Sequence, residues 1–338
     1  MKRLIPIVTL AVACALEPGP VQTDETPNPA PQYTGMCDAS TAVAVGMDRF
    51  LVVNDEDNIL RLYNADKPGP ALVARDITDL LTLENKKKEA DIEGSAALGG
   101  ALYWITSHGR NKDGEIKRNR YQLFALTLAE QNGEISLART GKPYTRLMED
   151  MLQEEGLKDF MLDPLKEKEN PALAPEQKGT NIEGLAAWQR DQLLIAFRNP
   201  IPGGKALLVP LQNPARVVEG DKAKFGKPIQ LDLGGFGIRS IELWPQQSAY
   251  LIVAGPSDDQ GAFQLFQWSG DPSRQPERIQ GADLSSLNPE AIVVYPDRND
   301  IQLLSDDGGL AVDGTACKDL TDPARRTFRS RWISLPSK

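Results

Sequence analysis

The sequence is poor in the residues and motifs on which many enzyme sites depend. Histidine occurs once, as His108, and cysteine occurs three times in 338 residues. No GxSxG nucleophile elbow, HExxH or CxxC motif, phosphate-binding P-loop or dinucleotide fingerprint is present. The sequence therefore offers neither a visible nucleophile nor a complete set of metal ligands, and these absences favour a binding protein over an enzyme.

Positive charge is also in deficit. The chain has 38 Lys and Arg residues against 47 Asp and Glu, a net charge of −9 and a pI of about 4.9. An acidic surface repels phosphate backbones, which argues against nucleic acid as a partner. Beyond the N-terminal segment no apolar run is long enough for a transmembrane helix. Short apolar runs are frequent instead, and a composition that is 41% apolar supplies a folded core.

Residues 1–14 have the features of a bacterial export signal. Lys2 and Arg3 precede an apolar run over residues 4–13, which is too short to span a bilayer. Cys14 follows, either as the lipid-acceptor cysteine of a lipoprotein or as an incidental residue beside an ordinary cleavage site. The Pro-rich residues 15–35 are typical of an extended tether. We expect an extracytoplasmic protein, periplasmic or anchored to the outer membrane only through an N-terminal lipid.

Two further cysteines lie near opposite ends of the remaining chain. In an oxidising compartment, Cys37 and Cys317 are expected to form a disulfide. Such a bridge would tie the first part of the folded region to the last. The alternative is a pair of free buried thiols.

Internal repetition is the strongest indication of the fold. Five segments begin with an acidic residue, continue as an apolar β-hairpin and end in a polar cluster. Their acidic residues are Asp38, Glu93, Glu183, Glu242 and Glu290. A unit of about fifty residues with four short antiparallel strands has the size of a β-propeller blade. The sequence therefore predicts an all-β fold, a single β-propeller over residues 36–338 with about five blades.

Some details of this propeller stay open. A sixth blade is not excluded, because the interval after Glu93 is long. Residues 145–178 have helical spacing and are expected to form an insertion on the rim, either a lid or a solvated excursion. In the last unit, residues 309–314 and 328–335 are expected as the third and fourth strands. A β-sandwich is the rival fold, but it does not need an acidic residue at the head of each unit.

Strand direction places a candidate site at one mouth of the central channel. The first strand of a blade lines the channel and the second runs back antiparallel, so the start of one and the end of the other share a face. The five acidic residues are therefore candidate metal ligands, because their mutual repulsion must be offset by a cation, raised pKa values or basic neighbours. Oxygen ligands suit Ca²⁺ or another divalent cation. Candidate groups for a small anionic ligand at the same mouth are Arg110, Lys112, Arg198, Asn199 and Lys205.

His108 is expected at this mouth as well. Beside Glu93 it is a candidate acid–base group, which makes these two residues the catalytic candidates. A structural explanation competes with each of these roles. The carboxylates could each accept backbone N–H groups as a repeated clamp, and His108 could be a buried structural imidazole.

Several segments resemble a bacterial family known only as domain of unknown function thirty-six-sixteen. They are DASTAVAVGMDRFLVVNDEDNILRLY, EADIEGSA, NIEGLAA and LDLGGFGIRSIE, and the resemblance extends over residues 36–335. It implies one domain without an established activity. The E-G-[LS]-A openings are also similar to those of esterase-like phytase propellers, which implies a phosphoester or ester substrate and a metal requirement. Only the blade-opening glutamates match that group, so no catalytic residue is carried over from it.

Two functions follow from these patterns. The first is a monomeric binding module that holds a cation or a small anionic ligand at the acidic mouth, or presents that face to an envelope protein. The second is an extracytoplasmic, metal-dependent hydrolase of phosphate or carboxylic esters. In the second, Glu93 and Glu183 bind the metal and His108 acts as the acid–base group. The absence of a visible nucleophile favours the first.

Overall fold

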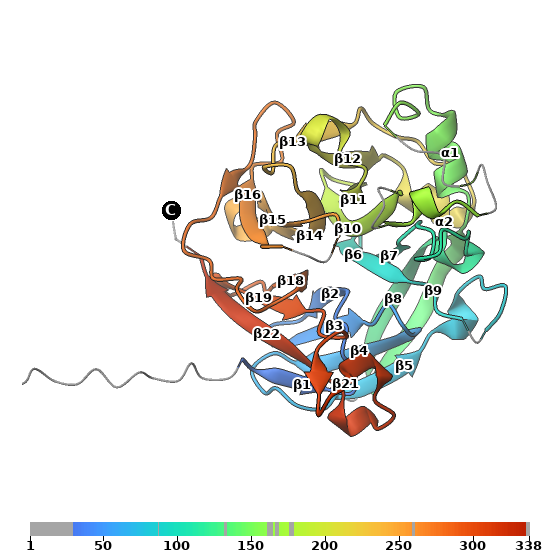
Figure 1. Cartoon of the computed structure of the whole chain (residues 1–338). Coiled ribbons are helices and arrows are strands. Elements are labelled where there is room, and N and C mark those ends of the chain that lie inside the picture. Colours follow the sequence, from blue (N-terminus) through green and yellow to red (C-terminus); the bar gives the residue numbers. More distant parts are fainter. Residues whose placement is uncertain are drawn as a thin grey trace, which may run out of the picture. The chain divides into compact units, whose positions relative to one another are not determined.

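The short apolar runs of the sequence form four-stranded antiparallel sheets. The computed structural model describes residues 30–335, apart from residues 87, 132–133, 161–164, 166–168, 176–178 and 259–260. Within these residues, five such sheets surround a common centre (Figure 1). Their inner strands contact one another in chain order, and the last contacts the first. The predicted propeller is confirmed with five blades, and no sixth blade occurs in the described part of the chain.

The blades share one strand order, from the channel outward. In the first four blades this order is also the order along the chain. From inner to outer strand, the blades are β2 (Thr41–Val45), β3 (Arg49–Val53), β4 (Ile59–Asn64) and β5 (Val73–Asp76); β6 (Ile92–Leu98), β7 (Ala101–Thr106), β8 (Leu123–Gln131) and β9 (Glu134–Tyr144); β10 (Asn181–Trp188), β11 (Gln192–Asn199), β12 (Ala206–Leu211) and β13 (Ile229–Leu231); β14 (Gly237–Trp244), β15 (Ala249–Gly255), β16 (Gln264–Trp268) and β17 (Glu277–Arg278); and β18 (Pro289–Val294), β19 (Asp300–Ser305), β22 (Thr327–Ser334) and β1 (Gln32–Thr34).

Both ends of the folded chain complete the last blade. Strand β22, predicted as its fourth strand, is the third, and β1 pairs with it as the outer strand. Residues 32–34, which the sequence pattern assigns to the tether, therefore belong to the propeller. The predicted third strand at residues 309–314 is wrong, because this segment contributes to a small hairpin of β20 (Ala311–Val312) and β21 (Thr315–Ala316). A local pattern does not reveal pairing between strands at opposite ends of a chain.

The predicted disulfide between Cys37 and Cys317 is confirmed. Their Cα atoms lie 5.9 Å apart, within the usual range for a disulfide. The bridge joins the segment before β2 to the 3₁₀ turn Cys317–Asp319, and so fastens the first blade to the last. No helix in the described residues is long and apolar enough to cross a membrane. Cys14 and the expected export signal lie outside the described residues, so lipidation stays a prediction.

Helices occur only where the described chain leaves the blades. The helix α1 (Leu147–Gln153) lies in the insertion predicted at residues 145–178 and confirms its helical beginning. The second helix, α2 (Pro214–Glu219), lies between β12 and β13. Both bury their apolar residues in the cluster formed by the second and third blades. They therefore belong to the hydrophobic core between these two blades.

Candidate functional site

A β-bulge near the start of four inner strands turns one side chain out of the regular sheet. The register of each inner strand against its neighbour skips one residue, and the skipped residues are Glu93, Glu183, Arg239 and Glu290. A bulge leaves its extra residue unpaired and changes the direction of the side chain. All four side chains line one cavity at the end of the channel where the inner strands begin.

Glycine follows the bulge in the second and third blades because neighbouring inner strands lie very close there. A Cβ on Gly94 would be 2.9 Å from the backbone N of Leu185 in β10, and a Cβ on Gly184 would be 2.9 Å from Cγ2 of Ile241 in β14. Any larger residue would force the strands apart in a close-packed core. The repeated E-G pair is thus a packing requirement beside a bulge that presents a functional side chain.

The cavity, which we call the mouth cavity, has a volume of about 530 Å³. It receives side chains from all five blades and from the loops between their strands. Nine of these are acidic and six are basic: Asp38, Asp55, Glu56, Asp91, Glu93, Asp113, Glu183, Glu290 and Asp306, with Arg110, Lys112, Arg120, Arg198, Arg239 and Lys318. The predicted convergence of charged residues at one mouth is therefore found, with an excess of acidic groups.

One of the five predicted carboxylates is not part of this site. Glu242 pairs with Leu251 near the far end of β14, and it lines a different cavity. The bulge position of this blade holds Arg239 instead. The prediction for Glu242 is wrong because it assumed that the acidic residue has the same position in every unit. In β14 the bulge falls three residues earlier, at Arg239. The mouth thus has four of the predicted carboxylates and an arginine in the fifth blade-opening position.

Arginines neutralise one side of the mouth cavity. Oε1 of Glu183 accepts hydrogen bonds from Arg198 Nη1 at 2.8 Å and from Asn181 Nδ2 at 2.9 Å, and Oε2 lies 2.9 Å from Arg239 Nε. Arg239 also pairs with Glu290. We call Glu183, Arg198, Arg239 and Glu290 the arginine half of the mouth. Guanidinium groups, rather than the backbone N–H groups of a clamp, are therefore the charged partners of these two carboxylates.

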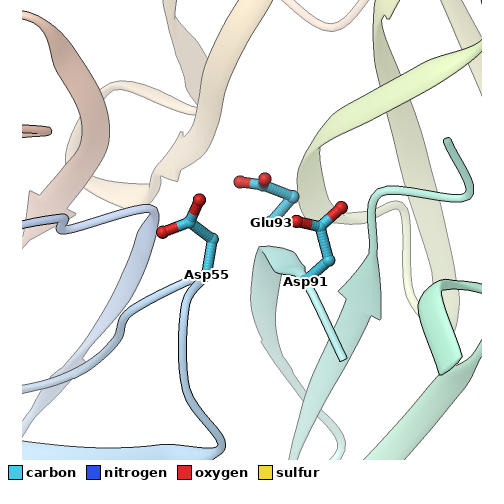
Figure 2. A group of neighbouring side chains, drawn as sticks. All are labelled: Asp55, Asp91 and Glu93. Atoms are coloured by element: carbon cyan, nitrogen blue, oxygen red, sulfur yellow. The ribbon is translucent and has the colours of Figure 1, made fainter. Parts of the chain in front are cut away.

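The opposite side holds converging carboxylates. One oxygen from each of Asp55, Asp91 and Glu93 lies within 4.8 Å of the other two, and Figure 2 shows the three side chains meeting from two neighbouring blades. Asp91 has one ion pair, 3.0 Å from Arg120. Oδ1 of Asp55 is buried and has no hydrogen-bond partner among the described residues. We call Asp55, Asp91 and Glu93 the carboxylate half of the mouth.

The electrostatics of the carboxylate half favour the uptake of positive charge. Burial raises the pKa of Asp55, Asp91 and Glu93, because each charge is removed from water. The negative charge of Asp91 and Asp55 raises the pKa of Glu93 further. Either protons or a cation must reduce this repulsion. Three oxygen ligands so close together are the arrangement with which proteins bind hard divalent cations.

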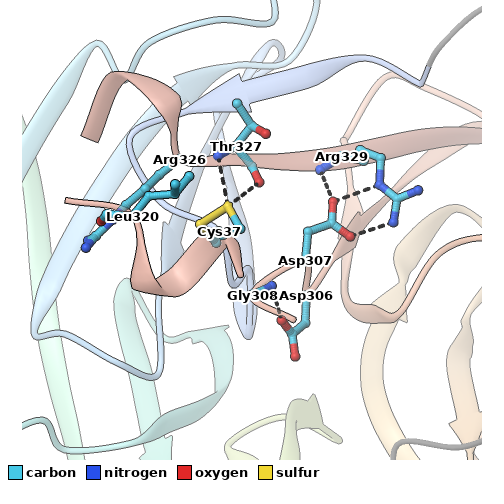
Figure 3. The surroundings of a disulfide bond; sticks show 9 residues. Cys37, Asp306, Asp307, Gly308, Leu320, Arg326, Thr327 and Arg329 are labelled. Carbon is cyan, nitrogen blue, oxygen red and sulfur yellow. Dashed lines mark hydrogen bonds and ion pairs between the residues drawn. A yellow bond between two sulfur atoms is a disulfide. The ribbon is translucent and has the colours of Figure 1, made fainter. Parts of the chain in front are cut away.

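Two more carboxyl groups, those of Asp38 and Asp306, line the mouth cavity close to the disulfide, and Figure 3 shows Asp306. The Cys37 carbonyl accepts a hydrogen bond from Asp307 N, and Asp306 Oδ1 accepts one from Gly308 N, both at 2.9 Å. Asp38 follows the bridged cysteine and is 5% exposed. Burial, together with the hydrogen bond to Asp306, raises the pKa of Asp38 to about 10. The disulfide that joins the first blade to the last therefore helps to hold Asp38 at the mouth cavity.

His108 lies away from the mouth cavity. It is fully buried, its Nδ1–H donates to the Thr106 carbonyl at 2.8 Å, and its ring meets that of Tyr121 edge-on. Burial lowers the pKa of His108 to about 4. A neutral imidazole enclosed in this way is a structural element, and the pairing of His108 with Glu93 as catalytic groups is not found.

The predicted anion-binding residues separate into two groups. Arg110, Lys112 and Arg198 line the mouth cavity. Asn199 does not line it, because its amide is buried and donates to the Pro175 carbonyl at 2.9 Å. Lys205 is exposed just before β12 and does not reach the cavity either. The predicted basic residues that do line the cavity therefore come from the loop after β7 and from the arginine half.

Sequence reasoning missed three residues of the site: Asp91, Arg120 and Arg239. Asp91 stands two residues before Glu93 with a positive φ of 60°, which non-glycine residues seldom adopt. The D-x-E spacing of Asp91 and Glu93 is the signal in the sequence that could have indicated it. Arg239 would have been found by aligning the repeats on their apolar residues, since I-E-G and I-R-S occupy the same register. Arg120 comes from a loop with no repeated pattern.

Comparisons with known proteins identify a family. A family model described as protein of unknown function (DUF3616) matches residues 38–302. No curated protein matches the chain. Among solved structures, a glutaminyl cyclase from Myxococcus xanthus is 13% identical with a TM-score of 0.41, over 90% of this chain and 95% of that one. A putative oxidoreductase (glucose dehydrogenase) from Thermus thermophilus is 12% identical with a TM-score of 0.44, over 89% and 98%. A β-1,3-galactosidase of family GH43 is 9% identical with a TM-score of 0.46, over 90% and 94%.

Proposed function

Since the chain belongs to the DUF3616 family of proteins of unknown function, we infer its role from the site itself and propose that the protein binds a divalent cation at the carboxylate half of its channel mouth. The single observation that carries this proposal is the convergence of oxygens from Asp55, Asp91 and Glu93 within 4.8 Å of one another. One arginine offsets part of their charge. A bound cation would neutralise the negative charge that remains.

The ligand set points to a hard cation such as Ca²⁺. Calcium takes six to eight oxygen ligands in a flexible arrangement, and the three carboxylates with nearby Asp38 and solvent fit that need. No histidine lines the cavity, and the cysteines at positions 37 and 317 form a disulfide. Softer metals prefer such nitrogen and sulfur ligands.

Two observations favour binding over hydrolysis. The hydrolase hypothesis used His108 as the acid–base group, and His108 is buried outside the mouth cavity. Arg198, one of the residues predicted to hold an anionic ligand, already contacts Glu183. The geometry thus supports a cation as the primary ligand.

Calorimetric titration of the purified, chelator-treated protein with CaCl₂, MgCl₂ and MnCl₂ tests the proposal. Calcium should bind, and at a hundredfold excess over its Kd it should stabilise the fold by about 2.7 kcal/mol. Glu93→Gln and Asp55→Asn remove ligand charge while keeping shape, and both should abolish the heat of binding and the rise in melting temperature. Asp191→Asn, at an exposed turn, is the matched control and should behave as wild type. Absence of binding for all three cations would contradict the proposal.

A further inference from the structure

The opposite end of the channel holds a second, chemically different cavity. The inner strands run in parallel from the mouth cavity to this end, and Glu242 lies three residues beyond Arg239, about 10 Å along β14. The cavity has a volume of about 540 Å³ and receives residues from all five inner strands. We call it the apolar cavity; its lining residues are Val43, Ala44, Gly46, Ala97, Ala187, Glu242, Leu243, Pro245, Gln246, Val294, Tyr295 and Pro296.

Small side chains create the space in this cavity. Ala44, Ala97 and Ala187 come from three different inner strands, and each leaves room that a larger residue would fill. Pockets for small molecules have volumes of about 300–1,000 Å³, mostly apolar walls and a few polar groups. The apolar cavity has these properties, and Glu242 is the one acidic or basic residue in its lining.

Glu242 has no cationic partner in the described structure. Its Oε1 accepts a hydrogen bond from Leu243 N at 3.0 Å, and no lysine or arginine lines the cavity. The closest aromatic hydroxyls are occupied: Tyr295 donates to Gln302 Oε1, and Tyr250 donates to the Ala187 carbonyl. The side chain thus presents a carboxyl group to the cavity with one oxygen left for a ligand.

The guanidinium groups close to this region are engaged elsewhere, and that of Arg49, beside Gly46, pairs with Glu130 at 2.8 Å. Arg298 stacks on the ring of Tyr295, outside the cavity lining, and forms two hydrogen bonds with Asp66. The positive charge of Arg298 is therefore offset by Asp66 and not by Glu242. Burial raises the pKa of Glu242 to about 8, which is the expected result when a carboxyl has no cation beside it.

We propose that the apolar cavity binds a small molecule with an apolar body and a single primary ammonium group, which pairs with Glu242. Apolar contacts with the alanines, Val43 and Val294 supply affinity, and the charge-assisted hydrogen bond supplies selectivity. This site is independent of the cation site, because the two cavities share no lining residue.

Binding of such an amine changes the protonation of Glu242. The free protein carries a proton on this carboxyl over much of the neutral range. The ligand arrives as an ammonium ion, the carboxylate forms, and the proton of Glu242 passes to solvent. Each bound amine therefore releases up to one proton, and the heat of binding depends on the ionisation enthalpy of the buffer.

Calorimetry with phenethylamine tests the proposal, with phenethyl alcohol as an uncharged ligand of nearly the same shape. At pH 7 the wild-type protein should bind the amine at least about tenfold more tightly than the alcohol, which is the expected value of one charge-assisted hydrogen bond. Glu242→Gln should remove this preference and the release of protons. Ala187→Leu should weaken both ligands by filling the cavity.

Matched controls separate this site from the cation site. Glu93→Gln should leave amine binding unchanged, and Glu242→Gln should leave calcium binding unchanged. The proposal is overturned if neither ligand binds, or if the alcohol binds as tightly as the amine. It is also overturned if Glu242→Gln keeps the preference, or if Ala187→Leu has no effect on either ligand.

Discussion

The two halves of the channel mouth use the same backbone device for different ends. In the arginine half, bulges in β10, β14 and β18 present Glu183, Arg239 and Glu290, which pair with one another. In the carboxylate half, the bulge in β6 presents Glu93 to Asp55 and Asp91, which are also negative. One half pairs its carboxylates with arginines, and the other holds three converging carboxylates, of which Asp91 pairs with Arg120.

This difference shows that the bulge fixes only where a side chain points. What the side chain does depends on the residues of its own blade and of the neighbouring blade that meet it. The third blade supplies Arg198 at the end of β11, whereas the first blade supplies Asp55 just after β3. A repeat architecture can therefore combine structural ion pairs and a ligand site around one channel without a change of fold.

The largest effect is expected from breaking the arginine half. Glu183→Gln leaves Arg198 and Arg239 buried beside a neutral amide, and all three side chains are at most 6% exposed. Removing one partner of a buried ion pair costs about 3–5 kcal/mol. Urea denaturation should show this loss equally with calcium and with EDTA. A loss that calcium reverses would mean that Glu183 is a metal ligand and that the two halves are not distinct.

Removing the disulfide that joins the first and last blades should have the next largest effect on stability. Replacing Cys37 and Cys317 together with Ser removes a bridge between residues 280 positions apart, and loss of a native disulfide costs about 2–5 kcal/mol. The double variant should also bind calcium more weakly, because Asp38 follows Cys37 directly. Denaturation and calorimetric titration measure the two effects. Unchanged calcium affinity would show that the bridge has no part in the carboxylate half.

The fold was predictable because its signals are local and repeated. Alternating apolar residues, turn residues and E-G pairs recur in successive units, and each unit forms its own sheet. The closing strand β1 was not predictable in this way. Its three residues lie in a Pro-rich stretch, and they become a strand only because β22 offers a free edge at the other end of the chain.

The site was predictable in position but not in pairing. Strand direction brought Asp38, Glu93, Glu183 and Glu290 to one cavity. It did not show that Glu183 and Glu290 are bound by arginines, because that depends on side chains of neighbouring blades. Glu242 was misplaced because a residue shift along a strand changes which end of the channel a side chain reaches.

A smaller effect should distinguish the arginines of the two halves. Arg120 pairs with Asp91, a member of the carboxylate half, and with Glu89. Arg120→Gln should lower metal-free stability, yet it should raise calcium affinity on the order of tenfold, because one positive charge no longer repels the cation. Arg239→Gln should lower stability with little effect on affinity. Calorimetric titration of both variants decides, and equal shifts in affinity would contradict the division of the mouth into halves.

The smallest effect is expected in the carboxylate half, where removing a charge should raise the stability of the metal-free protein. Without metal, Asp55→Asn should stabilise the protein by roughly 1 kcal/mol, because a neutral amide removes one charge from a buried group of like charges. Glu183→Gln should do the reverse, since it leaves Arg198 and Arg239 without the carboxylate that they share. In saturating calcium the order should change, because wild type gains stability from the bound ion and Asp55→Asn does not. Urea denaturation in EDTA and in calcium, with Asp191→Asn as the control, measures all four combinations. If Asp55→Asn destabilises the metal-free protein as Glu183→Gln does, Asp55 is a structural residue and the carboxylate half is satisfied without a ligand.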